Sequence, residues 1–143
     1  MNPAVLIILV LLIGNRYLNS GMTLGDWIYS TLLMLPAIII ALSFHEAAHG
    51  FVSYWLGDPT PKLQGRLTLN PISHIDPIGF LALLIAGFGW GRPVQINPAY
   101  YKHRRRDEFL VSIAGVATNF LLAAGAAVLI KTFYAQVVYS TLA

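Results

Sequence analysis

Apolar residues form long uninterrupted blocks along the chain, separated by short polar segments. The longest block has no charged side chain from Trp27 to Phe44, and its apolar character continues past Glu46 to Leu56. As a helix, the 31 residues 27–57 would extend about 46 Å, more than the ~30 Å hydrocarbon core of a bilayer. This block therefore predicts a membrane-spanning helix, kinked at Pro36 and ended by Gly57-Asp58-Pro59.

Four further segments complete the pattern: a second span, a short apolar run, a loop and a re-entrant segment. The 22 residues Phe109–Ile130 predict a second span, with small residues that permit close helix packing (Ala114, Gly115, Ala117, Ala123, Ala124, Gly125, Ala126 and Ala127). The ten residues Ala4–Ile13 are too few to cross a bilayer and make a poor signal peptide, and Gly14–Asp26 is predicted to be a loop. The 15 uncharged residues Pro77–Gly91 would reach only ~22 Å as a helix, which predicts a re-entrant segment.

Strict alternation of apolar and polar residues occurs in two short stretches. Leu67 and Leu69 alternate with polar residues within Gly65–Pro71, and Pro93–Pro98 repeats the pattern. Alternation with period two is typical of strands. The expected fold class is therefore a mainly α membrane protein, a transmembrane helix bundle with a re-entrant segment and a short β-element.

Composition supports a membrane protein of one domain, residues 1–143. Hydrophobic residues make up 57% and charged residues 10% of the 143 residues, against about 45–50% and 25% in soluble domains. Intrinsic disorder is excluded, because it requires low hydrophobicity and high charge. The chain has no cysteine, so His, Asp or Glu side chains must hold any metal.

Five positive charges lie between Arg92 and Arg106, next to the predicted span 109–130. The positive-inside rule places this segment in the cytoplasm, which explains Arg104–Arg106 better than nucleic-acid binding does. Because the re-entrant segment returns to its own side, the carboxyl end of the 27–57 helix shares that side. His45, roughly 27 Å along this helix, is thus expected at cytoplasmic depth.

One cluster of residues predicts chemistry. His45-Glu46-Ala47-Ala48-His49 is an H-E-x-x-H motif inside an apolar helix, where residues i and i+4 share a face. Two imidazoles on that face can bind one Zn²⁺, and the adjacent Glu46 can accept a proton from an activated water. The alternatives are a chance match, which should arise in well under about one in a hundred such chains, and a structural polar cluster.

A hydrolytic zinc site normally takes a third protein ligand. His74 and Asp76 follow the first predicted strand and are the candidates for it. An equally good interpretation makes this a proline-rich interfacial turn, with Asp76 fixing the backbone. Asp58 is expected to be a turn residue facing water, and Asp107 and Glu108 to be solvated flanking charges.

The order of motifs resembles the site-2 protease family of intramembrane zinc metalloproteases, in particular its short prokaryotic branch. The resemblance covers roughly residues 42–122 and rests on His45-Glu46-Ala47-Ala48-His49-Gly50, Leu56-Gly57-Asp58-Pro59-Thr60, Gly65-Arg66-Leu67-Thr68-Leu69-Asn70-Pro71, His74-Ile75-Asp76-Pro77-Ile78-Gly79 and Ala114-Gly115-x-x-x-Asn119. It implies His45 and His49 as zinc ligands, Glu46 as the general base, and a membrane-embedded bundle with a β-element beside the active site.

Two departures from the family pattern bear on activity. Val116 stands where the family usually has proline, and the family's Leu-Asp-Gly motif, which carries the third zinc ligand, does not occur. The residues after Lys131 are uncharged, and the chain ends within an apolar stretch. We therefore expect a domain that is incomplete at its carboxyl end, with the third ligand beyond Ala143. The alternatives are that Asp76 or His74 substitutes, or that the protein no longer cleaves.

The leading functional hypothesis is a multi-pass zinc metalloendopeptidase of the prokaryotic cell membrane, with its active site towards the cytoplasm. Its expected partners are the lipid bilayer and a transmembrane protein or peptide substrate, without nucleic acid. The second hypothesis is a non-catalytic membrane zinc-binding protein. A transporter is disfavoured, because it would place further carboxylates inside the spans.

Overall fold

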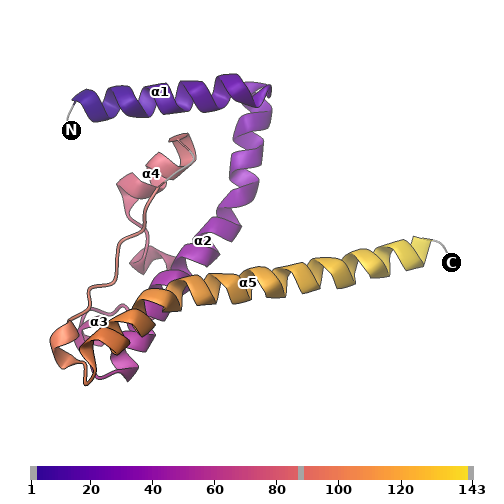
Figure 1. Cartoon of the computed structure of the whole chain (residues 1–143). Helices are drawn as coiled ribbons and strands as arrows, with labels where there is room; N and C mark the ends of the chain where they lie inside the picture. Colours follow the sequence, from indigo (N-terminus) through magenta and orange to yellow (C-terminus); the bar gives the residue numbers. More distant parts are fainter. Residues whose placement is uncertain (1–2, 87–88, 142–143) are drawn as a thin grey trace.

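The computed structural model describes residues 3–86 and 89–141, which are mostly helical (Figure 1). The elements in chain order are α1 (Pro3–Ser20), α2 (Leu24–Trp55), α3 (Thr60–Leu63), the 3₁₀ turn η1 (Pro71–Ser73), α4 (Pro77–Ala86), the 3₁₀ turn η2 (Pro98–Tyr100) and α5 (Arg104–Thr141). The amino-terminal part of α5 packs against the carboxyl-terminal part of α2, and the rest of α5 extends away from the other helices (Figure 1). The helical fold class is therefore confirmed.

The first helix is longer than predicted, so the expected loop at Gly14–Asp26 is wrong for most of its length. α1 continues to Ser20, and the polar side chains near its end form hydrogen bonds within the helix. Asn19 donates to the Asn15 side chain at 2.6 Å, and the Ser20 hydroxyl donates to the Tyr17 carbonyl at 2.7 Å. The chain turns at Gly21, where φ is +64°, a conformation that favours glycine.

α2 begins at a reciprocal capping arrangement. The Thr23 hydroxyl oxygen accepts the Asp26 backbone N–H, and the hydroxyl donates to the Asp26 carboxylate at 2.7 Å. The helix therefore starts three residues before Trp27, at Leu24, and it curves along its length (Figure 1). Its predicted end is confirmed, because Trp55 is the last helical residue and Gly57 takes a φ of +105°.

Small residues bring α2 and α5 together, as predicted, but only along one stripe of α5. Ala47 of α2 is buried, as are Ala114 and Gly115 of α5. The other small residues of α5 that were expected to permit packing are exposed: Ala117, Ala123, Ala124, Gly125, Ala126 and Ala127. A helix meets one neighbour along a single face, so only residues spaced three or four apart reach it.

The two predicted strands do not form. Residues 66–70 and 92–97 are irregular, and across the described ranges 3–86 and 89–141 the only β-pairing is an isolated antiparallel bridge between Ile75 and Gly91. In the second segment, the Val94 and Asn97 N–H groups donate to carboxylates instead of to a neighbouring strand. Side chains thus supply the partners that a sheet would otherwise provide.

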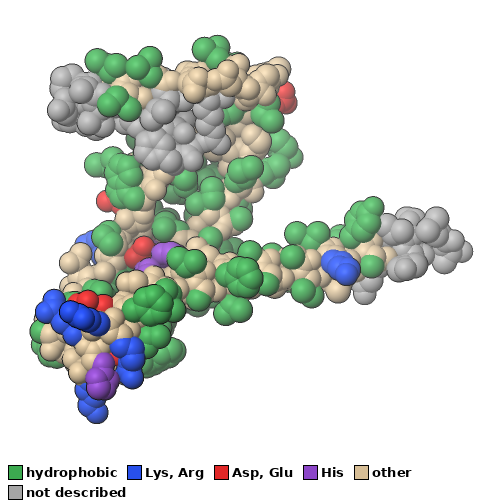
Figure 2. Space-filling model, viewed as in Figure 1, with side chains coloured by type: hydrophobic (Ala, Val, Ile, Leu, Met, Phe, Trp, Pro, Cys, Tyr) green, Lys and Arg blue, Asp and Glu red, His purple; other side chains and the backbone are tan. Residues whose placement is uncertain are grey.

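The helices α2 and α5 carry apolar surface that the protein itself leaves uncovered. Leu24–Trp55 and Arg104–Ala135 are long and apolar enough to cross a membrane. Only 6% of an apolar 18-residue stretch of each helix is buried within the protein. Figure 2 shows hydrophobic side chains along the outside of both helices. A core helix of a soluble protein would be largely buried, so this exposure supports a helical membrane protein.

The predicted re-entrant segment contains α4, a helix of 10 residues that lies beside α1. The chain passes from the region of α3 to α4 and then returns to η2 near the start of α5 (Figure 1). Residues 87–88 of this segment lie outside the described residues. Its re-entry into a membrane stays a prediction.

Candidate metal centre

His45 and His49 converge on one face of α2. Their ring centroids are 4.7 Å apart, and their Nε2 atoms are 3.0 Å apart. Four residues of α-helix place the two side chains one turn apart on the same face, so the pair is a direct consequence of the motif spacing. Both imidazoles are partly buried at the crossing with α5.

Helix α5 contacts the second nitrogen of each imidazole. His49 Nδ1 lies 2.6 Å from the Val111 carbonyl oxygen, and His45 Nδ1 lies 3.2 Å from Asn119 Nδ2. Val111 and Asn119 are eight residues apart, which is about two helical turns, and therefore lie on the same side of α5. Both rings are thus oriented from their Nδ1 sides, and both Nε2 atoms face one point.

Gly115 lies midway between Val111 and Asn119 along α5, and it faces the two Nε2 atoms. A Cβ added at Gly115 would be 2.6 Å from Nε2 of His45 and 2.6 Å from Nε2 of His49. Real Cβ atoms do not approach other atoms so closely, so glycine is the residue that allows the two helices to pack here.

These residues fit zinc. Two nitrogen ligands about 2.05 Å from a tetrahedral metal are roughly 3.3 Å apart, close to the 3.0 Å between the Nε2 atoms. Outer contacts to the far ring nitrogens are a regular feature of histidine metal ligands. The histidines therefore provide two ligand positions with the orientation that a metal requires.

Glu46 is held by the segment that follows α4. Its Oε2 atom accepts the Val94 N–H at 3.1 Å. Val94 also packs near Gly50, where an added Cβ would be 3.5 Å from the valine Cγ1 atom. The irregular residues 92–97 therefore lie against the side of α2 that carries Glu46 and Gly50.

The two candidates for a third ligand are engaged elsewhere. His74 is fully buried, and its Nε2 atom lies 2.7 Å from the Thr68 carbonyl oxygen. Asp76 accepts the Gly79 N–H at 2.8 Å, and so caps the start of α4 as the turn interpretation expected. In the ranges 3–86 and 89–141, no group of three His, Asp or Glu side chains could hold a metal.

Asp58 and Asp107 are buried, so the expectation that they face solvent is wrong. Asp107 is 1% exposed and accepts the His103 N–H at 3.0 Å at the start of α5. Glu108 pairs with Arg104 at 2.9 Å, and its side chain is 38% exposed, as a flanking charge would be. A carboxylate that accepts backbone N–H groups can be buried at a helix end, where charge counts alone suggest solvent.

Asp58 joins three parts of the chain that surround the site. It accepts hydrogen bonds from the Ser53 hydroxyl at 2.8 Å, the Thr60 N–H at 2.9 Å and the Asn97 N–H at 2.7 Å. Burial alone would raise the pKa of Asp58, but these hydrogen bonds stabilise the carboxylate more strongly and lower its pKa below the ordinary 3.8. Asp58 therefore anchors residues 92–97, the segment that contacts Glu46.

We predict that Asp58→Ala destabilises the protein by roughly 3 kcal/mol or more, because each buried donor left without a partner costs about 1–3 kcal/mol. The measurement is thermal unfolding in detergent. Asp76→Ala, which removes an acceptor for one N–H group, is the matched control and should cost less.

The same carboxylate predicts a pH dependence. Folding lowers the pKa of Asp58. Its contribution to the free energy of unfolding is therefore present above the unfolded pKa and is lost as the pH falls through the folded pKa. The stability difference between wild type and Asp58→Asn should therefore shrink as the pH falls below 3.8. A difference that is constant down to strongly acidic pH would contradict this role.

Sequence reasoning missed the role of four groups at the site. Gly115 and Asn119 were singled out only as packing or motif residues, and the Val111 carbonyl and Val94 N–H were not considered. The spacing 111–115–119 on an apolar helix was the available signal, because it places one carbonyl, one glycine and one amide on a single face. Nothing in the pattern of residues 92–97 pointed to Glu46.

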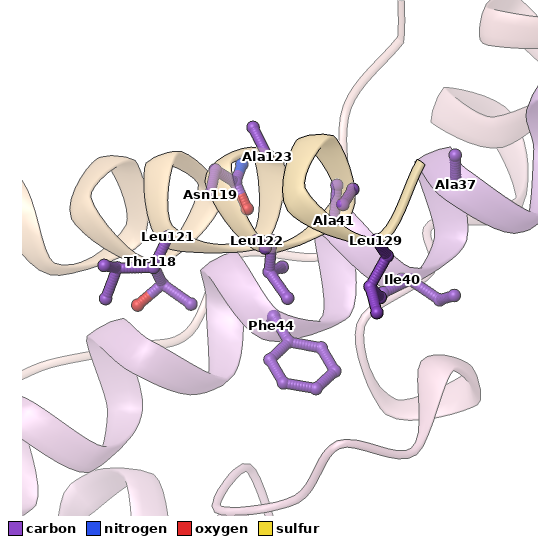
Figure 3. A pocket seen from close by; sticks show the side chains of 12 residues that line it. Ala37, Ile40, Ala41, Phe44, Thr118, Asn119, Leu121, Leu122, Ala123 and Leu129 are labelled. Carbon is purple, nitrogen blue, oxygen red and sulfur yellow. The ribbon is translucent and has the colours of Figure 1, made fainter. Parts of the chain in front are cut away.

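A groove of about 740 Å³ lies between α2 and α5 beside this centre (Figure 3). Its walls are apolar apart from Thr118 and Asn119, and it includes Phe44, the residue before His45. The fold and the site together are those of a mostly helical protein with two long apolar helices, which suggest a membrane, and a pair of histidines at their crossing.

Known proteins that resemble the chain are named as zinc metalloproteases. It is 48% identical over 101 residues to the "Putative zinc metalloprotease YwhC" of Bacillus subtilis (strain 168), covering 68% of this chain and 46% of that protein. It is 33% identical over 98 residues to the "Putative zinc metalloprotease Rip2" of Mycolicibacterium smegmatis, covering 64% of this chain and 37% of that protein. The Rip2 protein of Mycobacterium tuberculosis is 32% identical over 97 residues, with the same coverage.

The chain spans less than half the length of these curated relatives. No family model and no solved structure matches it. The relatives support a protease-family function and zinc as the metal.

Proposed function

We propose that this chain provides the metal-binding core of an intramembrane zinc metalloprotease of the site-2 type. The observation that carries the proposal is the convergence of His45 Nε2 and His49 Nε2, 3.0 Å apart and opposite Gly115, on a helix whose apolar surface is exposed. The names of the relatives support the same chemistry.

Each residue of the motif has a distinct role. His45 and His49 hold the zinc, and zinc when bound polarises the scissile carbonyl and lowers the pKa of water. Glu46, one residue from the first ligand, takes the proton from the attacking water and delivers it to the leaving amine. The Val94 N–H holds the Glu46 carboxylate by one oxygen, so its other oxygen is available for the proton.

The proposed substrate is a membrane-embedded segment of another protein or peptide. The groove between α2 and α5 offers it an apolar surface next to the metal centre. The segment must be locally unwound, because a helix engages its carbonyl groups in internal hydrogen bonds. The protein would work within the bilayer of a prokaryotic cell, as a multi-pass protein with α4 re-entrant.

We predict that Glu46→Gln lowers cleavage of a model transmembrane peptide by about 10²–10⁴-fold, the usual contribution of general acid–base catalysis. Zinc content should be unchanged, since glutamine keeps the acceptor for the Val94 N–H and both imidazoles. The assay uses the longest natural form of the protein, reconstituted in lipid vesicles.

Glu108→Gln is the matched control. The Glu108 side chain pairs with the exposed Arg104, so this substitution should leave turnover unchanged. Undiminished turnover by Glu46→Gln would refute the assigned base.

We also predict the orientation in the membrane. The five positive charges between Arg92 and Arg106 should hold this segment in the cytoplasm, and the turn at Met22 should lie on the opposite side. Cysteine is absent from the chain, so Lys102→Cys and Met22→Cys each introduce a single thiol. A membrane-impermeant thiol reagent added to intact cells should label Met22→Cys and not Lys102→Cys. Labelling of Lys102→Cys instead would show that the protein has the opposite orientation.

The second candidate is a membrane zinc-binding protein without protease activity. It is favoured because, among the described residues, no group of three His, Asp or Glu side chains could hold a metal ion. In that case wild type and Glu46→Gln would bind zinc equally, and neither would cleave the peptide.

A further inference from the structure

An unpartnered oxygen lies beside the first histidine. Asn119 Nδ2 lies 3.2 Å from His45 Nδ1. The Asn119 Oδ1 atom is buried without a hydrogen-bond partner among the described residues. Buried polar atoms nearly always have a partner, so this oxygen calls for an explanation.

The tautomer of His49 is the one that zinc binding requires. A carbonyl oxygen can only accept, so the 2.6 Å contact with Val111 puts a hydrogen on His49 Nδ1. A neutral imidazole carries one hydrogen, which leaves a lone pair on His49 Nε2, the atom that faces His45. The backbone of α5 thus sets the tautomer of His49 for metal binding.

The Nδ1 atom of His45 faces an amide side chain instead of a carbonyl, and an amide can donate or accept. If Asn119 Nδ2 donates to His45 Nδ1, the hydrogen of the ring is on Nε2, where it can bond to His49 Nε2 but excludes a metal. A half turn of the Asn119 amide exchanges its nitrogen and oxygen, which are nearly equal in size. The oxygen then accepts a hydrogen from Nδ1, and His45 Nε2 is left with a lone pair.

We propose that Asn119 is a positioning residue that sets the tautomer of His45, with its Oδ1 atom accepting the Nδ1 hydrogen when Nε2 binds metal. The inference rests on the proposed zinc site. An amide suits this place because it can donate or accept, and so it satisfies His45 in either tautomer. Val111 and Asn119, on one face of α5, thus contact the Nδ1 atoms of both imidazoles and orient the rings.

The first test is zinc affinity of the detergent-solubilised protein, measured by competition with a chromophoric chelator. Asn119→Leu, which keeps the volume and removes both polar atoms, should weaken zinc binding about 10–100-fold. Asn119→Asp keeps an acceptor and should retain wild-type affinity. Ser112→Ala is the matched control, because Ser112 is exposed on the same helix and its hydroxyl donates to the Glu108 carbonyl. If leucine crowds the groove, Asn119→Ala makes the same deletion without added bulk.

The second test reads the tautomers directly. Nitrogen NMR of ¹⁵N-histidine-labelled protein, freed of metal with a chelator, should show more hydrogen on His45 Nδ1 in Asn119→Asp, whose side chain can only accept, than in wild type or in Asn119→Leu. The tautomer of His49, held by the Val111 carbonyl, should be the same in all variants and serves as an internal reference. A purely structural role for Asn119 would not move the His45 tautomer.

Wild-type zinc affinity in both Asn119→Leu and Asn119→Ala, or one His45 tautomer in all variants, would overturn the inference. A wild-type protein that binds no zinc through His45 would instead overturn the proposed metal site. The tautomer measurement needs no metal, so it would still decide the role of Asn119.

Discussion

Zinc should be lost from the purified protein when either histidine of the pair is replaced. We expect about one equivalent of zinc in the wild type, and none after dialysis in His45→Ala or His49→Ala. Each substitution removes one of the two nitrogens that lie 3.0 Å apart, and a single imidazole holds the metal weakly. The loss should exceed the ~10–100-fold effect of removing an outer partner of a ligand. Metal content is measured by mass spectrometry on detergent-purified protein.

His103→Ala is the matched control for this experiment. His103 is exposed just before α5, and its backbone N–H, which the substitution keeps, caps the helix through Asp107. Its zinc content should equal that of the wild type. Equal zinc in all four proteins would remove the metal assignment, and the proposed function with it.

A single added methyl group at Gly115 should also abolish tight zinc binding. The Cβ of Gly115→Ala would lie 2.6 Å from each of the two Nε2 atoms that would bind the metal. The rings cannot turn away freely, because Val111 and Asn119 contact their Nδ1 sides. We expect zinc affinity to fall by at least about 100-fold, the upper end of the losses seen on disturbing a ligand's surroundings. Calorimetric titration with zinc measures it.

Gly125→Ala is a closely matched control on the same helix. A Cβ at Gly125 meets no atom within 4 Å, so alanine should leave zinc binding unchanged. It should stabilise the helix by about 1 kcal/mol, because alanine has a higher helix propensity than glycine. Unchanged zinc affinity in Gly115→Ala would show that the metal does not lie between α2 and α5.

Local patterns in the sequence were enough to predict the two long helices and the histidine pair. Uncharged apolar blocks the length of a bilayer become α2 and α5, and the end of α2 follows from Gly57. The spacing of His45 and His49 alone brings them together, because four residues make about one helical turn. Such features depend on residues that are neighbours along the chain.

Local patterns failed where a distant partner determined the outcome. The alternation in residues 93–98 predicted a strand, but Glu46 and Asp58 accept the N–H groups that a neighbouring strand would have paired. The polar residues of Gly14–Asp26 predicted a loop, although Asn15 and Asn19 bond to each other along a helix. Alternation and polarity show where side chains point, and do not identify the groups that will satisfy the backbone.

The sequence by itself determined that this is a helical protein with an H-E-x-x-H face on an apolar helix. Only the tertiary structure decided what that face meets: the Val111 carbonyl, Gly115 and Asn119 of α5, more than sixty residues away. It also decided that Asp58 and Asp107 are buried, and that His74 and Asp76 bond to their own loop and helix end. The physical reason is that hydrogen bonds between distant segments depend on how the helices cross, and periodicity within one segment holds no information about that crossing.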